Sequence, residues 1–330
     1  MFRLALTVLF TALILAAGAC GGDGKRDPAV PLKVVTSIAP ITSLAENIGG
    51  TKIELTGLVP EGEPRKFAPS DSAAKALREA DLIILNGLGL EEATLQIAES
   101  SKKTDGVLLL LGDAAITSAE YGYDSSYPKS AGKPNPHAWV DPVITAEYAQ
   151  LIHEQFVDLD EENTKYYDAN FAELTKRLEH LDQQIRIAIQ TIQQANRKLL
   201  TYLDFLPYWA KRYGFTLVAA APLAEPTTGE ITALIAQIED EKAPAVFGPE
   251  TLAVEVIQRI TDETDAQYVT ELSAHDLPGK AGDKDHSHIG LLLKNMKAII
   301  PALGGDAAPL GRVKPGLVFS DGPSSAQYTQ

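Results

Sequence analysis

One stretch of the chain, residues 142–198, contains almost no glycine or proline. Within it, Leu, Ile, Tyr and Phe recur at steps of three and four residues among Glu, Lys and Gln, which is the spacing of amphipathic helices. The sequence therefore predicts a long helical region, broken into two helices near residues 158–163. We expect residues 166–197 to form a helix that connects the two halves of the chain.

Short apolar runs alternate with helical patterns on both sides of that region. The runs lie at residues 33–36, 53–59, 82–85 and 107–111, and again at residues 199–203, 216–219, 245–248 and 266–269. Such runs, when bounded by loops, are typical of buried parallel strands. The alternation predicts an α/β fold of two lobes with parallel-type sheets flanked by helices, joined by one long helix. Ligands of open α/β sheets bind beyond the carboxyl ends of the strands, so we expect the ligand cleft between the lobes.

These patterns also suggest where the parts of the chain begin and end. We expect an N-terminal lobe at residues 33–165, a C-terminal lobe at residues 198–304 and, because residues 305–330 are rich in Gly, Pro and Asp with little periodicity, a flexible tail.

The first residues are typical of an export signal. Arg3 precedes an apolar run at residues 4–17, and small residues follow up to Cys20, the only cysteine, which excludes an internal disulfide. We expect residues 1–19 to be a signal peptide and residues 20–32 a tether, with Cys20 carrying a lipid anchor to the membrane. Ala17 stands where lipoprotein signals prefer leucine, so ordinary cleavage of the same bond stays open. Both alternatives predict an exported protein that faces the periplasm or the cell exterior.

The charge balance narrows the class of ligand. A formal net charge of −15 argues against binding to nucleic acid, which needs clustered Lys and Arg, and is compatible with a cationic ligand. The sequence contains no Ser/His/Asp set, phosphate-binding loop or convincing acid/base pair at suitable spacing. We therefore expect a binding protein and not an enzyme.

Several segments, in order along the chain, resemble one family. They are VVTSIAP at residues 34–40, LVP at 58–60, ADLIILNGLGLE at 80–91, PHAWVDP at 136–142 and YWAKRYG at 208–214. The chain is similar, over about residues 34–303, to the zinc/manganese ABC transporter solute-binding proteins. This resemblance implies two α/β lobes bridged by a long helix, a zinc or manganese ion held between them, and delivery to an ABC permease and its ATPase.

The resemblance also implies four metal-binding side chains, and this sequence departs from that pattern. His137 stands at one of the four positions. The first loop reads EPRKF at residues 63–67, which places Arg65 where a histidine is expected. The third position falls on Leu203 with Asp204 beside it, and the fourth on Thr270 or Glu271. A guanidinium has no lone pair to donate, and a positive charge about 5 Å from a divalent ion costs roughly 6 to 7 kcal/mol at an effective dielectric of about 20.

Replacement donors are close at hand in the sequence. His275, His286 and His288 lie in one segment with several aspartates, and imidazole and carboxylate are both suitable ligands for transition metals. The alternative is a solvated acidic loop with incidental histidines. For His137 the alternative to a ligand is a buried histidine that serves packing.

Three functional hypotheses follow. The first is the extracytoplasmic binding component of an importer for Zn or Mn, a monomer, in which His137 acts with Asp204, Glu271, His275, His286 or His288. The second keeps the fold but binds an anionic solute or a metal chelate, with Arg65 as a charge partner in the cleft. The third is an adhesin-like surface protein with an empty cleft.

Overall fold

The computed structural model describes residues 30–59, 70–220, 227–322 and 326–329. In the N-terminal lobe it contains β1 (Leu32–Thr36), α1 (Ala39–Gly49), β2 (Ile53–Gly57), α2 (Asp71–Glu79), β3 (Leu82–Leu85), α3 (Glu92–Ser101), β4 (Val107–Leu110), α4 (Leu111–Ala115) and α5 (Pro142–Leu159). The long helix α6 (Thr164–Gln190) follows. The C-terminal lobe contains β5 (Lys198–Thr201), α7 (Pro207–Tyr213), β6 (Thr216–Ala219), α8 (Thr228–Glu241), β7 (Ala245–Phe247), α9 (Val254–Glu263), β8 (Gln267–Val269) and α10 (His288–Ala302).

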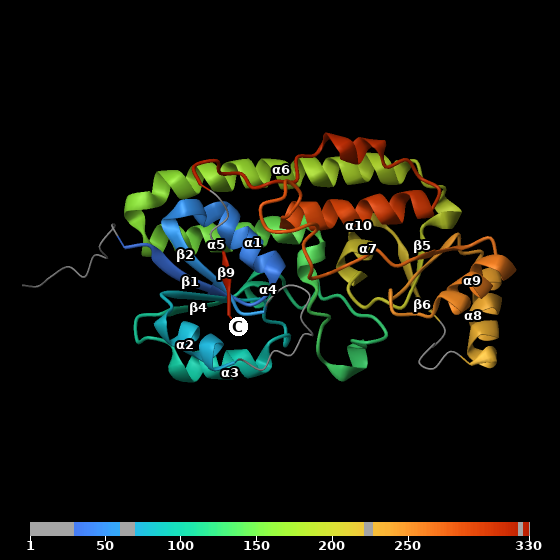
Figure 1. Ribbon diagram of the computed structural model, residues 1–330, viewed down its shortest axis with the longest axis horizontal. Coiled ribbons are helices and arrows are strands. Elements are labelled where there is room, and N and C mark those ends of the chain that lie inside the picture. The colour runs from blue at the N-terminus through green and yellow to red at the C-terminus, as the bar shows by residue number, and fades with distance from the viewer. Residues whose placement is uncertain (1–29, 60–69, 221–226, 323–325, 330) are drawn as a thin grey trace, which may run out of the picture.

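Each lobe has one parallel sheet. The strand order is β4-β3-β1-β2-β9 in the first sheet and β6-β5-β7-β8 in the second, where β9 (Gln327–Tyr328) comes from the end of the chain. Helices cover both sheets, and α6 runs along both lobes (Figure 1). The prediction of an α/β fold with two parallel-sheet lobes and a long joining helix is confirmed.

The alternation of side chains along the strands explains the layers of the N-terminal lobe. Val34 and Ile84 point to one face, in a cluster with side chains of α1, α5 and α6, while Val35, Ile83 and Leu85 pack on the other face with α2 and α3. Both faces are therefore apolar, as expected for a parallel sheet covered on both sides.

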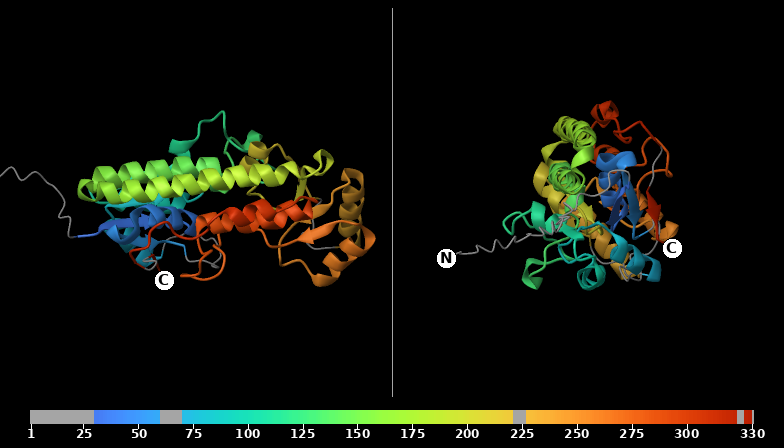
Figure 2. Two further views of the ribbon diagram at one scale, coloured as in Figure 1. Left: turned by 90° about the horizontal axis from the view of Figure 1, so that it is seen from above. Right: turned by 90° about the vertical axis from the view of Figure 1, so that its left-hand side faces the viewer.

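The helix α6 connects the lobes through its buried face. Its 27 residues correspond to a length of about 40 Å. Buried residues recur along it at helical spacing, and they are Tyr167, Asn170, Leu174, Leu178, Leu181, Gln184, Ile185, Ala188 and Ile189. The same apolar cluster continues into β5, β7 and α10, so one core runs through both lobes. Figure 2 shows α5 and α6 side by side above α10.

The C-terminal segment differs from our expectation of a flexible tail after residue 304. It contains a 3-10 helix, η6 (Ala308–Arg312), and then returns to the N-terminal lobe, where β9 pairs in parallel with β2. The Arg177 side chain of α6 donates to the carbonyl of Gly316 over 2.7 Å, which holds the segment against the long helix. Periodicity could not reveal this path because β9 has only two residues.

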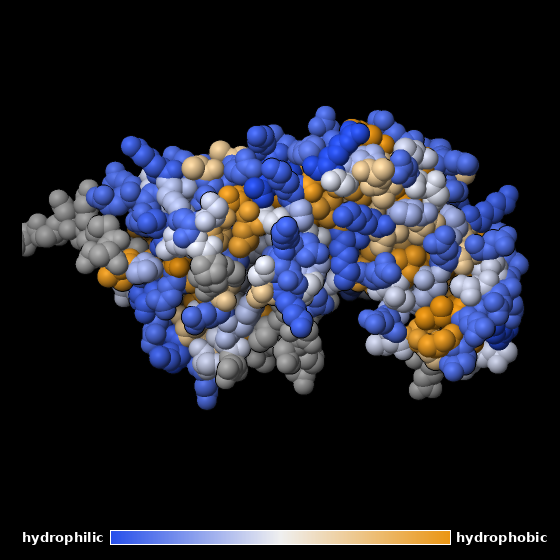
Figure 3. Space-filling view, turned by 45° about the horizontal axis from the view of Figure 1, so that its top comes forward, coloured by the Kyte–Doolittle hydropathy of each residue, from blue (hydrophilic) through white to orange (hydrophobic). Residues whose placement is uncertain are grey.

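The surface outside the core is mostly hydrophilic in the view of Figure 3, and the lower outline is hollowed between the two lobes. Among the residues that the structure describes, no helix is both long and apolar enough to cross a lipid bilayer.

Candidate metal site

His137 precedes a short 3-10 helix, η3 (Ala138–Val140), and its side chain is only 2% exposed. The Oδ1 atom of Asn135 accepts from the main-chain N–H of His137 over 2.8 Å and lies 3.0 Å from its ring Nδ1. The amide NH₂ of Asn135 points the other way, because Nδ2 donates to Asp124 Oδ2 over 2.6 Å and to the carbonyl of Asp204. Since Oδ1 can only accept, Nδ1 carries the proton, and Nε2 is the lone-pair nitrogen of the neutral ring.

His275 lies in the segment after β8 and meets His137 from the other lobe. The two ring centroids are 5.4 Å apart and the ring planes are nearly perpendicular, at 83°. The indole of Trp139 lies beside both, 5.0 Å from the His137 ring and 5.2 Å from that of His275. Its Nε1 donates to the carbonyl of Ala274 over 2.7 Å, which holds the His275 segment in place. Two buried imidazoles from distant parts of the chain are thus brought together.

Aromatic rings complete the surroundings of His137. Tyr127 and Phe205 each lie 6.2 Å from its ring, measured between centroids. Phe205 comes from the segment between β5 and α7, so both lobes contribute to this aromatic wall. Trp139 is fully buried and lies beside both histidines.

Two aspartates, Asp124 and Asp204, contact the amide nitrogen of Asn135, on the side away from His137. Asp124 accepts from the main-chain N–H groups of Ser126 and Tyr127 over 2.9 and 2.8 Å. Burial raises the pKa of Asp124, and the charge of Asp204 nearby raises it further. Asp204 therefore sits next to the residue that orients His137, and its main chain contacts that residue directly.

An ion pair between a half-buried arginine and a buried aspartate joins the two lobes. Arg212 of α7 donates through Nε to Asp141 Oδ2 over 2.8 Å, and the Asp141 side chain is 2% exposed. The other oxygen of Asp141 accepts from the main-chain N–H of Val143 and so caps α5. Burial raises the pKa of Asp141, whereas Arg212 acts in the opposite direction.

The structure does not bring His288, His286 or Glu271 to the imidazoles of His137 and His275. The Nε2 of His288 lies 2.9 Å from the carbonyl of Trp139, to which it must donate, and the ring is buried at the start of α10. His286 is half-buried, with Nδ1 3.2 Å from the carbonyl of Pro278 in its own loop. Glu271 is exposed and lines a different pocket with Lys294 and other residues of α10. Within residues 30–59, 70–220, 227–322 and 326–329, no group of three His, Cys, Asp or Glu side chains is placed to hold a metal ion.

Two predicted positions cannot be compared with this geometry. Arg65 and Cys20 lie outside the described residues.

Sequence reasoning missed the residues that support the histidines. Asn135 and Asp124 were not candidates, although an asparagine two residues before a candidate ligand is a signal that could have singled out Asn135. The link from Trp139 to Ala274 joins residues 135 positions apart, and only the folded chain reveals it.

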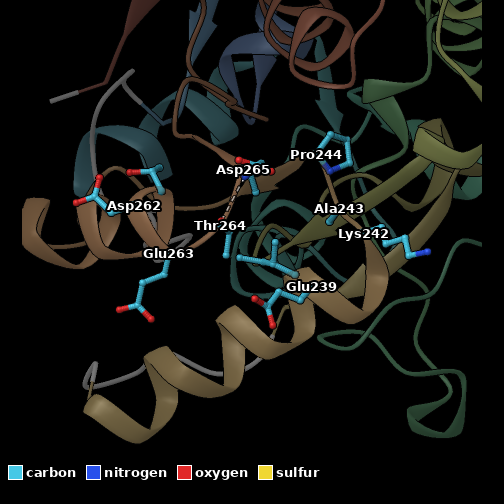
Figure 4. Close-up of a pocket in the computed structure, with 11 residues that line it drawn as sticks. Glu239, Lys242, Ala243, Pro244, Asp262, Glu263, Thr264 and Asp265 are labelled. Carbon is cyan, nitrogen blue, oxygen red and sulfur yellow. Dashed lines mark hydrogen bonds between the residues drawn. The ribbon is translucent and has the colours of Figure 1, made fainter.

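An acidic pocket in the C-terminal lobe also lacks three donors placed to hold a metal ion, among the residues that the structure describes. A pocket of about 550 Å³ in the C-terminal lobe is lined by Glu239, Asp262, Glu263 and Asp265, with Lys242 at its side. Figure 4 shows that the carboxylates of Glu239, Asp262 and Glu263 do not converge on one point. Among the residues that the structure describes, they form no group able to hold an ion.

The fold and the histidine pair define a class of two-lobed α/β binding proteins with a long helix between the lobes. The chain belongs to the family described as ZnuA, zinc-uptake complex component A, periplasmic, whose model matches residues 34–302. It is similar to the metal ABC transporter substrate-binding lipoprotein FimA of Streptococcus parasanguinis, with 27% identity over 89% of this chain and 96% of that protein. It is also similar to the manganese-binding lipoprotein MntA of Halalkalibacterium halodurans, with 25% identity over 92% of this chain and 99% of that protein.

A solved structure shows the same fold. The periplasmic zinc-binding protein TroA of Treponema pallidum superposes with a TM-score of 0.69 at 23% identity, covering 83% of this chain and 99% of that one. The family resemblance predicted from the sequence motifs is confirmed.

Proposed function

We propose that this chain is the extracytoplasmic substrate-binding component of an ABC importer for a divalent transition metal, which it binds at His137 and His275. The observation that supports this most directly is the meeting of two buried imidazoles, one from each lobe, at a centroid distance of 5.4 Å. Metal-ligating histidines usually donate their second ring nitrogen to a fixed partner, and the bond from His137 to Asn135 has that form.

The chemistry of the donors favours zinc over manganese. Imidazole suits zinc, copper and nickel, whereas manganese prefers oxygen ligands. The relatives carry both names, since MntA is named for manganese and TroA for zinc. Because the described residues bring two imidazoles together without a third histidine or acid, we propose that zinc binds more weakly than at a complete four-donor site. Asp204, which the sequence suggested as a further ligand, contacts Asn135 through its main-chain carbonyl and forms no group of three donors with the two imidazoles among the described residues.

The incomplete donor set also favours a second candidate. A metal that arrives with ligands of its own would need few donors from the protein, and Tyr127, which is half-buried with its ring 6.2 Å from that of His137, offers packing surface for an organic ligand. In this case Arg65 would act as a charge partner for an anionic chelate.

The remaining predictions belong to the same proposal. We propose that the protein is not an enzyme, that it acts as a monomer with an ABC permease and its ATPase, and that Cys20 anchors it to the membrane outside the cytoplasm. Replacement of Cys20 by alanine should release the protein from membranes, and unchanged membrane partitioning would contradict the anchor.

The proposed function is tested by elemental analysis of the purified protein and by calorimetric titration with Zn²⁺ and Mn²⁺. We expect one zinc per chain and tighter binding of Zn²⁺ than of Mn²⁺. Tighter binding of Mn²⁺ would contradict the argument from the donors. Co-purification of a metal together with an organic molecule would favour the chelate, and the absence of any metal binding would overturn both candidates.

A further inference from the structure

Two asparagines with almost no solvent exposure form hydrogen bonds with the segments that carry the two imidazoles, one asparagine for each segment. Asn86 directly follows β3 and is 0% exposed, and Asn295 lies within α10 and is 2% exposed. A buried amide can satisfy main-chain groups that no helix or strand satisfies, so the partners of these two side chains indicate what they hold.

Asn86 holds the segment that carries His137. Its Nδ2 donates to the carbonyl of Pro136, immediately before His137, over 3.0 Å. Its Oδ1 accepts from the hydroxyl of Tyr148 in α5 over 2.9 Å. The main-chain N–H of Asn86 donates to Glu91 Oε1 over 2.9 Å. Two bonds thus fix the side chain of Asn86, and a third fixes its main chain, while the side chain contacts the His137 segment.

The turn after Asn86 is unusually constrained. Gly87, Leu88 and Gly89 have φ values of 76°, 53° and 78°, and a leucine rarely adopts a left-handed backbone. Glu91 accepts from the N–H of Gly87 over 3.0 Å, and Asp113 accepts from that of Leu88 over 2.8 Å. Backbone strain of this kind persists only where the surroundings hold it, and it clusters at functional sites.

Asn295 holds the segment that carries His275. Its Oδ1 accepts from the main-chain N–H of Ser273 over 3.0 Å, and its Nδ2 donates to the carbonyl of the same residue over 2.7 Å. The hydroxyl of Ser273 in turn accepts from the N–H of His275 over 3.2 Å. One side chain thus fixes both main-chain groups of a residue that is two positions from the imidazole.

We propose that Asn86 and Asn295 are positioning residues for metal binding, each holding the segment of one histidine so that the two imidazoles meet in a fixed geometry. The proposal rests on the proposed function, because it concerns affinity for the metal. Neither His137 nor His275 lies in a regular α-helix or strand, so hydrogen bonds from neighbouring elements must supply the rigidity. Loss of such supporting bonds typically lowers metal affinity by about 10- to 100-fold.

The chain offers a matched control for a role in folding alone. Asn47 is 3% exposed and also uses both ends of its side chain, donating to the carbonyl of Ser43 over 2.8 Å and accepting from the N–H of Val318 over 3.0 Å. Neither partner belongs to the segment of His137 or to that of His275, although the hydroxyl of Ser43 accepts from the main-chain N–H of His288. Replacement of Asn47 removes a buried asparagine with a similar set of bonds without touching the proposed site.

The experiment compares Asn86→Leu, Asn295→Leu and Asn47→Leu with the wild type, since leucine keeps most of the volume. Zn²⁺ affinity is measured by competition with a chromophoric chelator, and stability by urea unfolding of the metal-free protein. The visible absorption of bound Co²⁺ reports the geometry of the ligands. We expect all three variants to lose stability, and only Asn86→Leu and Asn295→Leu to lose about 10- to 100-fold in Zn²⁺ affinity and to change the Co²⁺ spectrum.

The outcomes separate the two proposals. If the wild type binds Zn²⁺ and all variants bind it equally, or if Asn47→Leu loses as much affinity as the other two, the positioning role is overturned and the proposed function stands. If the wild type binds no metal, both fall. Should Asn86→Leu fail to fold, Tyr148→Phe removes only the hydroxyl that fixes Asn86. An unchanged affinity and Co²⁺ spectrum in Tyr148→Phe would then overturn the role of Asn86.

Discussion

Two histidine-bearing segments of this protein are held in opposite ways. In the first, residues 135–141, hydrogen bonds reach the other lobe: Tyr208 donates to the carbonyl of Asn135 over 2.7 Å, and Arg212 donates to Asp141 over 2.8 Å. In the second, residues 276–286, most bonds stay within the segment, as between the N–H of Lys280 and Asp283 Oδ2 over 2.8 Å. We call them the His137 turn and the acidic loop.

The difference shows that a dense run of histidines and aspartates indicates a supply of donors but not their placement. Residues 279–285 are exposed, and the imidazole of His286 contacts its own loop. The two histidines that meet are His137 and His275, and each is buried and held by bonds from elsewhere in the fold. Preorganised donors come from such support, because a metal site needs its ligands fixed to within a fraction of an ångström.

The largest contrast between the two segments should appear in stability. Asp141→Ala removes the ion-pair partner of Arg212, which is itself about one third exposed, and the cap of α5, so we expect the free energy of unfolding to fall by about 1–3 kcal/mol. The matched change in the acidic loop, Asp285→Ala, removes an exposed carboxylate, and we expect an effect within about 0.5 kcal/mol. Urea denaturation measures both. Equal losses in the two variants would break the comparison.

The next effect concerns pH and the histidine at the start of α10. Burial lowers the pKa of His288 to about 4, so the unfolded chain binds this proton near pH 6.5 while the folded protein does not. The unfolded state therefore binds more protons between these values, and the free energy of unfolding should fall by about 3 kcal/mol as the pH drops from 6.5 to 4. The free energy of unfolding loses nothing to protonation of His288 above pH 6.5, where its imidazole is neutral in both states.

His288→Gln tests the assignment, since the glutamine amide can still donate to the carbonyl of Trp139 but does not titrate. Unfolding by urea at several pH values should show a shallower loss of stability on acidification in the variant than in the wild type. Parallel curves for the two proteins would mean that His288 does not carry this pH dependence.

The positions of the strands show what could be predicted from the sequence. The run at residues 82–85 is β3, because an apolar stretch between Asp81 and Asn86 has few other places to lie than inside a parallel sheet. The long helix followed from its spacing of apolar residues, although α6 ends at Gln190, several residues before the predicted end. Such local patterns carry over into the fold because burial of one helix face or strand decides them.

The candidate site could be predicted only in part, because it depends on contacts between distant residues. His137 stood out through its motif, whereas counting along the chain placed the fourth ligand at Thr270 or Glu271. In the structure β8 ends at Val269, and the chain bends so that His275, and not the exposed Glu271, faces His137. The path of that segment is set by Asn295 and Trp139, which no local pattern reveals.

A third effect separates the segments by metal affinity. His137→Ala should weaken Zn²⁺ binding by at least about 100-fold, equivalent to about 2.7 kcal/mol, because it removes one of the two imidazoles. His286→Ala in the acidic loop should leave the affinity unchanged. Calorimetric titration of both variants gives the answer. Tight binding that survives His137→Ala and is lost in His286→Ala would move the site into the acidic loop.

The smallest effect is expected in the shape of the molecule when metal binds. The bonds of the His137 turn to the C-terminal lobe, together with α6, leave little freedom for the lobes to move, since a single apolar core includes Leu181 of α6, Leu199 of β5 and Met296 of α10. Opening of the lobes would have to expose this core.

We therefore expect the radius of gyration from small-angle scattering to change by less than about 1 Å when Zn²⁺ is added. The exposed part of the acidic loop, residues 279–285, can rearrange without altering that value. A larger decrease in the radius of gyration would mean that the bonds across the lobes, such as that between Arg212 and Asp141, form only in the metal-bound state. Asp141→Asn would then shift the scattering of the metal-loaded protein towards that of the free protein, whereas rigid lobes predict no change in shape for the same variant.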